Sequence, residues 1–246
     1  MALYAIGDLH LSLDGKKSME VFGGRWMDYI NKIERGFSLL TDDDMCVLCG
    51  DLTWGMSMED AMEDFRFLAR LPGKKIILKG NHDYWWSTAA KAYRFFEEHD
   101  LQGFEILNNN CVLYGDYALC GTRGWFFEEE RGGAHDKKIL LREIGRLETS
   151  LKAAGERQKL VFLHYPPKYQ GYACEEILTL LKEHHVSLCC YGHIHGKGCS
   201  SAFQGQYEGT MFKLVSADYL DFVPLKILEL QLQHQSFQCT FRIDLL

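Results

Sequence analysis

The chain has 246 residues, of which 27 are lysine or arginine, 34 are aspartate or glutamate and ten are histidine, so its formal net charge is −7. This acidic balance disfavours a general nucleic-acid-binding protein, which needs positive charge to neutralise phosphates. A hydrophobic fraction of 47% and a charged fraction of 25% are typical of a globular protein and exclude a disordered one. The length and the absence of a linker-like segment predict a single domain over residues 1–246.

The first residues and the cysteines predict a cytoplasmic protein that does not bind membranes. Residues 1–6 carry no basic region, and this apolar run is too short for a signal peptide. No stretch approaches the ~18 apolar residues of a membrane span. The nine cysteines are an odd number and are scattered, as expected of reduced thiols. Cys46 and Cys49 match C-x-x-C, but in a strand they point to opposite faces, so we interpret both as core residues.

In the first part of the chain a strand, a polar motif and a helix follow one another repeatedly. The apolar runs predict strands at residues 3–6, 45–48 and 75–78, and helical spacing predicts helices at 26–40, 58–71 and 87–98. This order is typical of an α/β fold with parallel strands, in which functional sites gather at the carboxyl ends of the strands.

The second part of the chain adds further strands and two helices. The pattern predicts a hairpin at 111–120, a charged helix ending near 154, a strand at 160–163, a helix at 174–183 and a strand at 187–191. Antiparallel strands are predicted after that, at 211–216, 225–230 and 239–243.

Five of the predicted strands end in residues that can bind a metal ion. The five segments are Asp8-Leu9-His10, Gly50-Asp51, Gly80-Asn81-His82-Asp83, His164 and Gly192-His193-Ile194-His195. In an extended segment, residues i and i+2 project from the same face, so Asp8 with His10 and His193 with His195 can each direct two donors into one cavity. Oxygen and nitrogen donors without thiolates favour Mn, Fe, Zn or Co over calcium or a structural zinc ion.

The order of these five segments resembles that of the calcineurin-like metallophosphoesterase family. The resemblance extends from Asp8 to His195, with the C-terminal strands fitting the family's second sheet. It implies a four-layer α/β/β/α sandwich of two mixed sheets flanked by helices. It also implies one metal held by Asp8, His10, Asp51 and His195. Asp51 would bridge to a second metal, which is completed by Asn81, His164 and His193.

The same resemblance implies a reaction. Two divalent or trivalent transition-metal ions would bind a bridging hydroxide that attacks a phosphate mono- or diester in line. His82 would face the substrate and protonate the leaving oxygen. Asp83, the acidic residue that follows it, and Asp51 are the other candidate catalytic residues. The motifs G-D-x-x-D-R-G and G-N-H-E of serine/threonine protein phosphatases are missing, so we expect a small phosphorylated substrate. The alternatives are a nucleotide phosphodiesterase or nuclease, and a scaffold that keeps the fold without catalysis.

The chain departs from the family pattern at Trp54. The family usually has G-D-x-x-D, and its second aspartate tends to support the catalytic histidine, whereas this chain has Gly50-Asp51-Leu52-Thr53-Trp54. Tryptophan cannot accept a charged hydrogen bond. Either another carboxylate orients His82, or the preferred leaving group needs little protonation.

Several residues near the motifs are candidate substrate contacts. Besides Asn81 and His82, these are Trp54, Trp85, Arg123 and Lys168. The alternative for Trp85 and its neighbour Trp86 is packing against the sheet, and for the two cations it is a solvated charge. Residues 128–130 are acidic and predict a solvated loop or a lid. The five histidines outside the motifs are interpreted as surface or capping residues: His99, His135, His184, His185 and His234.

Overall fold

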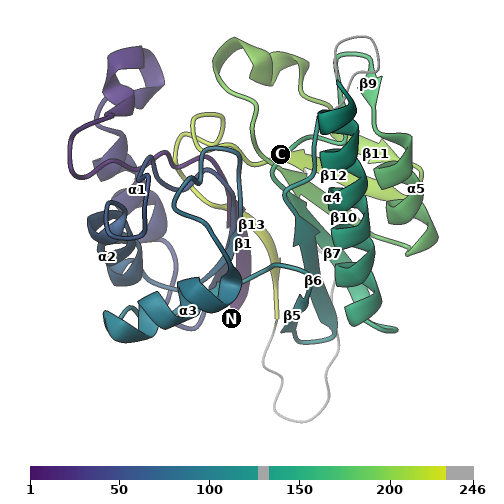
Figure 1. Cartoon of the computed structure of the whole chain (residues 1–246), viewed down its shortest axis with the longest axis horizontal. Helices are drawn as coiled ribbons and strands as arrows, with labels where there is room; N and C mark the ends of the chain where they lie inside the picture. The colour runs from purple at the N-terminus through teal and green to yellow at the C-terminus, as the bar shows by residue number, and fades with distance from the viewer. Residues whose placement is uncertain (127–132, 231–246) are drawn as a thin grey trace.

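The computed structural model describes residues 1–126 and 133–230, in which two mixed β-sheets pack face to face between two layers of helices (Figure 1). The four-layer sandwich predicted from the sequence is therefore confirmed. The predicted strand at 239–243, the acidic segment 128–130 and His234 lie outside the described residues. None of the helices in the described ranges is long and apolar enough to cross a bilayer.

The first sheet is built mainly from the N-terminal half of the chain. Its strands, in spatial order, are β13 (Leu225–Glu229), β1 (Ala2–Ile6), β2 (Met45–Cys49), β3 (Lys74–Leu78) and β4 (Phe104–Ile106). The four strands from β1 to β4 are parallel, and β13 pairs antiparallel with β1. The carboxyl ends of β1, β2 and β3 therefore meet at one edge of the sheet.

The second sheet comes from the C-terminal half. Its spatial order is β11 (Gly205–Tyr207), β12 (Thr210–Leu214), β10 (Leu188–Tyr191), β7 (Gln158–Leu163), β6 (Tyr117–Thr122) and β5 (Cys111–Tyr114). The central strands are parallel, and β5 and β11 are antiparallel edges. A separate two-stranded ribbon joins β8 (Lys168–Tyr169) to β9 (Tyr172–Ala173).

Helices cover the outer face of each sheet. The first sheet carries α1 (Tyr29–Phe37), α2 (Met62–Arg70) and α3 (Ala89–Glu98), and the second carries α4 (Ala134–Ala153) and α5 (Glu175–Glu183) (Figure 1). Short 3-10 turns occur at Met19–Phe22, Gly24–Trp26 and Gly196–Ser201. The Thr88 hydroxyl caps α3 by accepting a hydrogen bond from the backbone nitrogen of Lys91.

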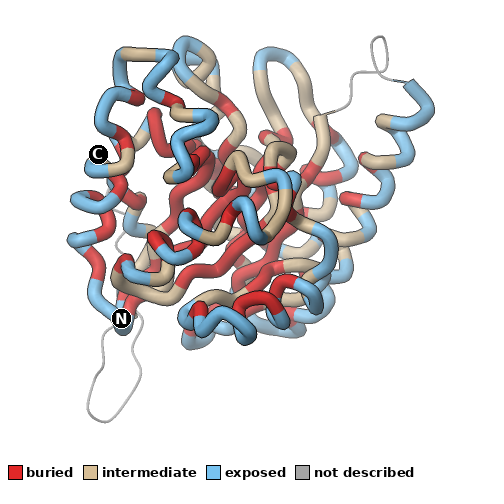
Figure 2. Tube along the Cα trace, turned by 60° about the vertical axis from the view of Figure 1, so that its left-hand side comes forward, coloured by how far each residue is buried: buried red, intermediate tan, exposed pale blue. Residues whose placement is uncertain are grey.

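The central strands of both sheets are buried on both faces, as the continuous red core of Figure 2 shows. Alternate residues of each strand face the helices or the opposite sheet, as the pleat requires. Cys46 packs in the helix-facing core and Cys49 between the sheets. The two thiols therefore lie on opposite faces of β2, which confirms their interpretation as core residues.

The structure corrects three expectations about the elements. Strand β12 was predicted to be antiparallel, but it runs parallel to β10 and antiparallel only to β11, because the chain crosses over through the 3-10 turn and returns. Strand β13 was expected in the second sheet and instead extends the first. The helices predicted at 26–40 and 58–71 are shorter, because turns occupy their first residues and, in the first helix, also residues 38–40.

Candidate metal centre

The seven predicted metal donors lie at the carboxyl ends of five strands, three from the first sheet and two from the second. Six of them form two clusters in which the potential ligand atoms lie within 4.8 Å of one another: Asp8, His10 and His195 in the first, and Asp51, His164 and His193 in the second. The donor Asn81 joins the second cluster through its Oδ1, which lies 2.7 Å from His164 Nε2. The structure therefore brings these seven residues together.

The first cluster is centred on Asp8. The Nε2 atoms of His10 and His195 are 3.3 Å apart, and Asp8 Oδ1 lies 3.5 Å from His195 Nε2. Asp8 is fully buried, and its carboxylate accepts the backbone N–H of His193 at 2.9 Å. Two imidazole nitrogens and a carboxylate oxygen thus point toward one another.

The second cluster is centred on the buried ring of His164. Its Nδ1 lies 3.0 Å from the carbonyl oxygen of Cys49, and its Nε2 lies 2.7 Å from Asn81 Oδ1. Asp51 Oδ2 is 3.5 Å from the same Nε2 and 3.8 Å from His10 Nε2. The Asp51 carboxylate therefore stands between the two clusters.

The backbone around the donors adopts conformations that only a few residues favour. Asp8, His10, Asp51 and His193 all have positive φ, between 46° and 71°. Non-glycine residues in this left-handed region carry strain, which is found repeatedly at functional sites. These turns direct the side chains back over the ends of the strands.

Two glycines are required by the closeness of the carboxylates. A Cβ atom on Gly80 would collide with Asp51 Oδ1, and one on Gly192 would collide with Asp8 Oδ2. Both glycines lie inside the sequence motifs, so the motifs encode the space for the carboxylates as well as the donors.

The hydrogen bonding of the donor residues is compatible with a bound metal ion. A neutral His164 has one ring proton and faces two oxygen acceptors, the Cys49 carbonyl and Asn81 Oδ1, so one of its nitrogens is left with a lone pair. Such an unmatched lone pair is what a bound cation satisfies.

The pKa values of the donor residues in the two clusters are also compatible with a bound cation. Burial, with the charges of Asp83 and Asp8, raises the pKa of Asp51 to about 9, so a positive ion would be needed to keep this carboxylate charged. Burial lowers the pKa of His10 and of His193 to about 3, which leaves both imidazoles neutral, as metal ligands must be. Burial also opposes the charge of His195, but Asp8 and Asp218 outweigh it and raise the pKa to about 10, so this imidazole would have to release its proton when a cation binds.

Two further carboxylates brace the clusters from outside. Asp83, predicted among the catalytic residues, is buried and accepts the backbone N–H groups of Gly80, Asp51 and Leu52 and the indole N–H of Trp85 at 2.7–2.9 Å. Its oxygens are occupied by the turns that carry the donors, so the structure places it in a supporting position.

The second brace, Asp218, was missed in the sequence. Its Oδ1 lies 3.0 Å from His195 Nδ1, and its Oδ2 accepts the backbone N–H of Gly196 at 2.8 Å. A carboxylate on the outer nitrogen of a ligand histidine fixes its tautomer and orientation. The signal was available, because Asp218 closely follows the apolar strand predicted at 211–216, as the other polar residues follow theirs.

His82 has a different neighbour from the one the family pattern suggests. Its Nδ1 lies 3.1 Å from the Tyr84 hydroxyl, and its backbone N–H donates to Asp51 Oδ1 at 2.7 Å. The Trp54 ring stacks on His10 with a centroid distance of 5.0 Å and lies 4.6 Å from the His82 ring. A tyrosine hydroxyl and an aromatic face thus surround His82, without a carboxylate at its ring among the described residues.

The remaining candidates for substrate contact are distributed differently. Trp85 is buried and packs edge-on against Phe65, so its ring belongs to the core. Lys168 has its ammonium over the rings of Tyr207 and Phe203. Arg123 lies near the second cluster, because its carbonyl oxygen accepts the backbone N–H of His164 at 3.1 Å.

The chain matches one protein family and shares its fold with solved structures. The model of the calcineurin-like phosphoesterase family matches residues 1–197. The protein of unknown function AQ665 from Aquifex aeolicus has a similar structure, with a TM-score of 0.50 and 16% identity over 92% of this chain and 95% of that one. The protein TT1561 of Thermus thermophilus gives a TM-score of 0.45 and 14% identity over 79% and 82% of the two chains. No curated protein matches the sequence.

Proposed function

This chain belongs to the calcineurin-like phosphoesterase family, and we propose that it hydrolyses a phosphate ester at a centre of two metal ions. Membership of the family implies a metal-dependent hydrolase. The observation that carries the dinuclear proposal is the position of Asp51, whose Oδ2 lies within 3.8 Å of a histidine nitrogen in each cluster. A carboxylate in this position can serve both ions.

The proposed roles of the residues follow from their positions. Two bound divalent ions would supply the activation of water and the charge that neutralises the phosphoryl group. The first cluster would hold one ion and the second cluster, with Asn81, the other. Asp51 would contribute to both, and its Oδ1 accepts the backbone N–H of His82, which keeps the proton donor next to the centre.

We assign the proton of the leaving oxygen to His82. If the Tyr84 hydroxyl donates to Nδ1, the ring carries its proton on Nε2 and can donate it from there. Trp54 holds the ring from one face. Tyr84 would therefore take the orienting part that the family pattern gives to an aspartate.

Metal content and turnover test the proposal together. The purified chain is stripped with a chelator, reloaded with Mn, Co, Fe or Zn and assayed for bound metal by plasma mass spectrometry. Hydrolysis of p-nitrophenyl phosphate and of bis-p-nitrophenyl phosphate is measured on each form. We expect two ions per chain and turnover of at least one ester, and the ratio of the two rates separates a monoesterase from a diesterase. Tight binding of two ions without turnover of either ester would favour the scaffold alternative.

A further inference from the structure

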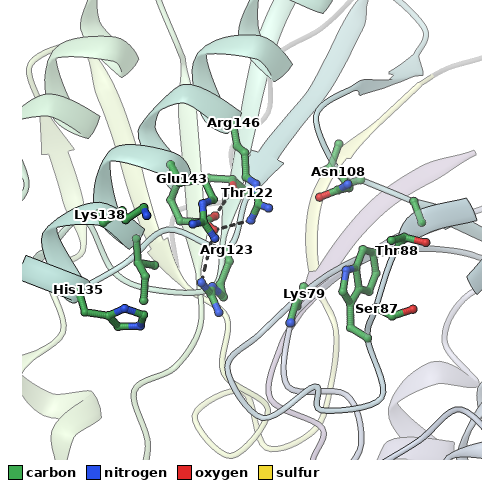
Figure 3. A pocket seen from close by; sticks show the side chains of 15 residues that line it. Lys79, Ser87, Thr88, Asn108, Thr122, Arg123, His135, Lys138, Glu143 and Arg146 are labelled. Atoms are coloured by element: carbon green, nitrogen blue, oxygen red, sulfur yellow. Dashed lines mark hydrogen bonds and ion pairs between the residues drawn. The ribbon is translucent and has the colours of Figure 1, made fainter. Parts of the chain in front are cut away.

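A polar cavity of about 430 Å³ lies between the loop that leads from β3 to α3 and helix α4 (Figure 3). One wall is formed by the loop between β3 and α3, with Lys79, Ser87 and Thr88. The opposite wall is formed by the end of β6 and one face of α4. Its volume falls within the range of small-molecule sites.

The lining of this cavity is strongly cationic. Five basic side chains line it, against one carboxylate, Glu143; they are Lys79, Arg123, Lys138, Arg142 and Arg146. The chain as a whole has a net charge of −7, so this concentration of positive charge is a local feature. Such a cavity attracts anions and repels cations.

Only part of this charge is neutralised by residues that the structure describes. Glu143 is buried and contacts Arg146 Nη1 at 2.7 Å and Arg123 Nη2 at 3.4 Å, as the dashed lines in Figure 3 show. Within residues 1–126 and 133–230, Lys79, Lys138 and Arg142 have no carboxylate within 4.0 Å. Three cations therefore remain without an opposite charge in this part of the chain.

Two further features supply hydrogen-bond donors without partners. Arg123 Nε is buried and finds no acceptor in the described part of the chain. The N-terminus of α3 borders the cavity through Thr88 and Ala89, and the first N–H groups of a helix favour an anion. A bound anion would satisfy both.

The cavity is connected to the metal centre by the chain itself. Lys79 precedes the donor Asn81 by two residues, and the carbonyl oxygen of Arg123 accepts the backbone N–H groups of His164 at 3.1 Å and Tyr165 at 2.8 Å. Residues of one wall thus lie next to the ligands of the second ion.

We propose that this cavity binds a second anionic group, a phosphate in the first instance, of the same molecule whose ester is cleaved at the metal centre. The inference rests on the proposed function and narrows it, because the substrate class becomes phosphate esters with a second phosphate at some distance from the first. The charge of the cavity selects the second phosphate, and the metal centre cleaves the first.

The test uses pairs of substrates that differ in the second phosphate alone. The Mn-loaded protein is assayed with α,ω-alkanediol bisphosphates of increasing length, each against the monophosphate of the same diol. We expect kcat/KM to favour the bisphosphate by about tenfold or more at one chain length, with the preference lost at shorter lengths. Equal values at every length would overturn the proposal.

Variants test whether the cavity causes the preference for the bisphosphate. The double substitution Lys138→Gln with Arg142→Gln removes two of the unpaired charges and should lower the bisphosphate-to-monophosphate ratio about tenfold. Lys137→Gln is the matched control, because Lys137 is exposed on the same helix and does not line the cavity. A ratio that is unchanged in the double variant, or lowered equally in the control, contradicts the assignment.

Binding measurements distinguish a failure of this proposal from a failure of the proposed hydrolase activity. Isothermal titration of the Mn-loaded protein with each member of a pair should show tighter binding of the bisphosphate, weakened in the double variant. If binding differs in this way but no ester is hydrolysed, the hydrolase proposal fails and the cavity stands. If added sulfate raises the turnover of a monophosphate to that of its bisphosphate, the cavity binds a free anion. This outcome would refute the proposal that it binds the second phosphate of the substrate.

Discussion

The two donor clusters of the metal centre are built from the same residue types but are supported differently. In the first, His195 is held from outside by Asp218, and Trp54 covers His10. In the second, the outer carboxylate Asp83 binds no histidine among the described residues and instead ties three backbone N–H groups and an indole. The first support orients a ligand, whereas the second shapes the chain that carries the ligands. Substitutions at these positions should therefore have separable effects.

The largest effect is expected where the clusters meet. Asp51→Asn replaces the carboxylate that lies between them and should lower kcat by about 10³-fold or more while reducing bound metal, because an amide cannot supply the same charge to two ions. Asp43→Asn, an exposed carboxylate near the same strand, is the control. Full activity in Asp51→Asn would show that the clusters do not share a ligand.

A smaller and more selective effect is expected at Asp218. Asp218→Asn keeps an acceptor but removes the charge on the outer nitrogen of His195, so the first cluster should bind Mn²⁺ about 10–100-fold more weakly. A calorimetric titration with Mn²⁺ should show one weakened and one unchanged metal-binding site. Asp221→Asn, on the exposed surface, should leave both unchanged. Equal weakening of both sites would remove the distinction between the clusters.

Tyr84→Phe examines the side of the centre that faces the substrate. The hydroxyl contacts the His82 ring, which is not one of the proposed metal donors, so metal content should stay at the wild-type level. We expect kcat/KM to fall about tenfold for phenyl phosphate and much less for p-nitrophenyl phosphate, since only the poorer leaving group needs the proton of His82. An equal loss with both esters would indicate a structural role for the hydroxyl.

Lys75 can be compared with these clusters, because it is a buried charge that has no opposite charge beside it in the described part of the chain. Its ammonium donates to the carbonyl oxygen of Leu71, and no carboxylate lies within 4.0 Å in the described part of the chain. Burial lowers its pKa from 10.5 to about 8. Between these pH values the unfolded chain binds more protons than the folded one, so this group makes the free energy of unfolding rise with pH.

Lys75→Met should therefore stabilise the metal-free chain by about 1–3 kcal/mol near pH 7. The difference from the wild type should shrink as the pH rises from about 8 to 10.5, which denaturant titrations at several pH values would measure. Lys91→Met, at an exposed position of α3, should show no such trend. A difference that does not depend on pH would mean that Lys75 is not desolvated.

Much of the fold, and the five segments that carry the candidate donors, could be predicted because both depend on local sequence. Short apolar runs bounded by turn residues indicate the strands, and a polar residue after each run indicates the edge at which the donors meet. The positive φ values at Asp8 and Asp51 had no comparable signal, because a strained turn depends on what packs against it. The pairing of β13 with β1 depends on contacts between residues far apart in the chain, for example Ala2 with Glu229, and local patterns do not encode such contacts.

The neighbours of His82 illustrate the same limit. The sequence shows that Trp54 replaces the expected aspartate, and it raises the question of what else orients the imidazole. Tyr84 lies two residues from His82, yet which way its hydroxyl points depends on the turn at Asp83. The cavity lined by Lys79 and Arg142 was also missed, because its cations come from segments far apart in the chain.

Each cluster draws its donors from both sheets, and this has a consequence for the durability of the fold. His10 and His195 are 185 positions apart, and an ion held between them would close a loop that includes most of the chain. Such an ion would cross-link the two halves of the sandwich at one edge, as a disulfide would, but a chelator could remove it. The free energy of unfolding would then rise with the concentration of free metal, and a chelator would lower it.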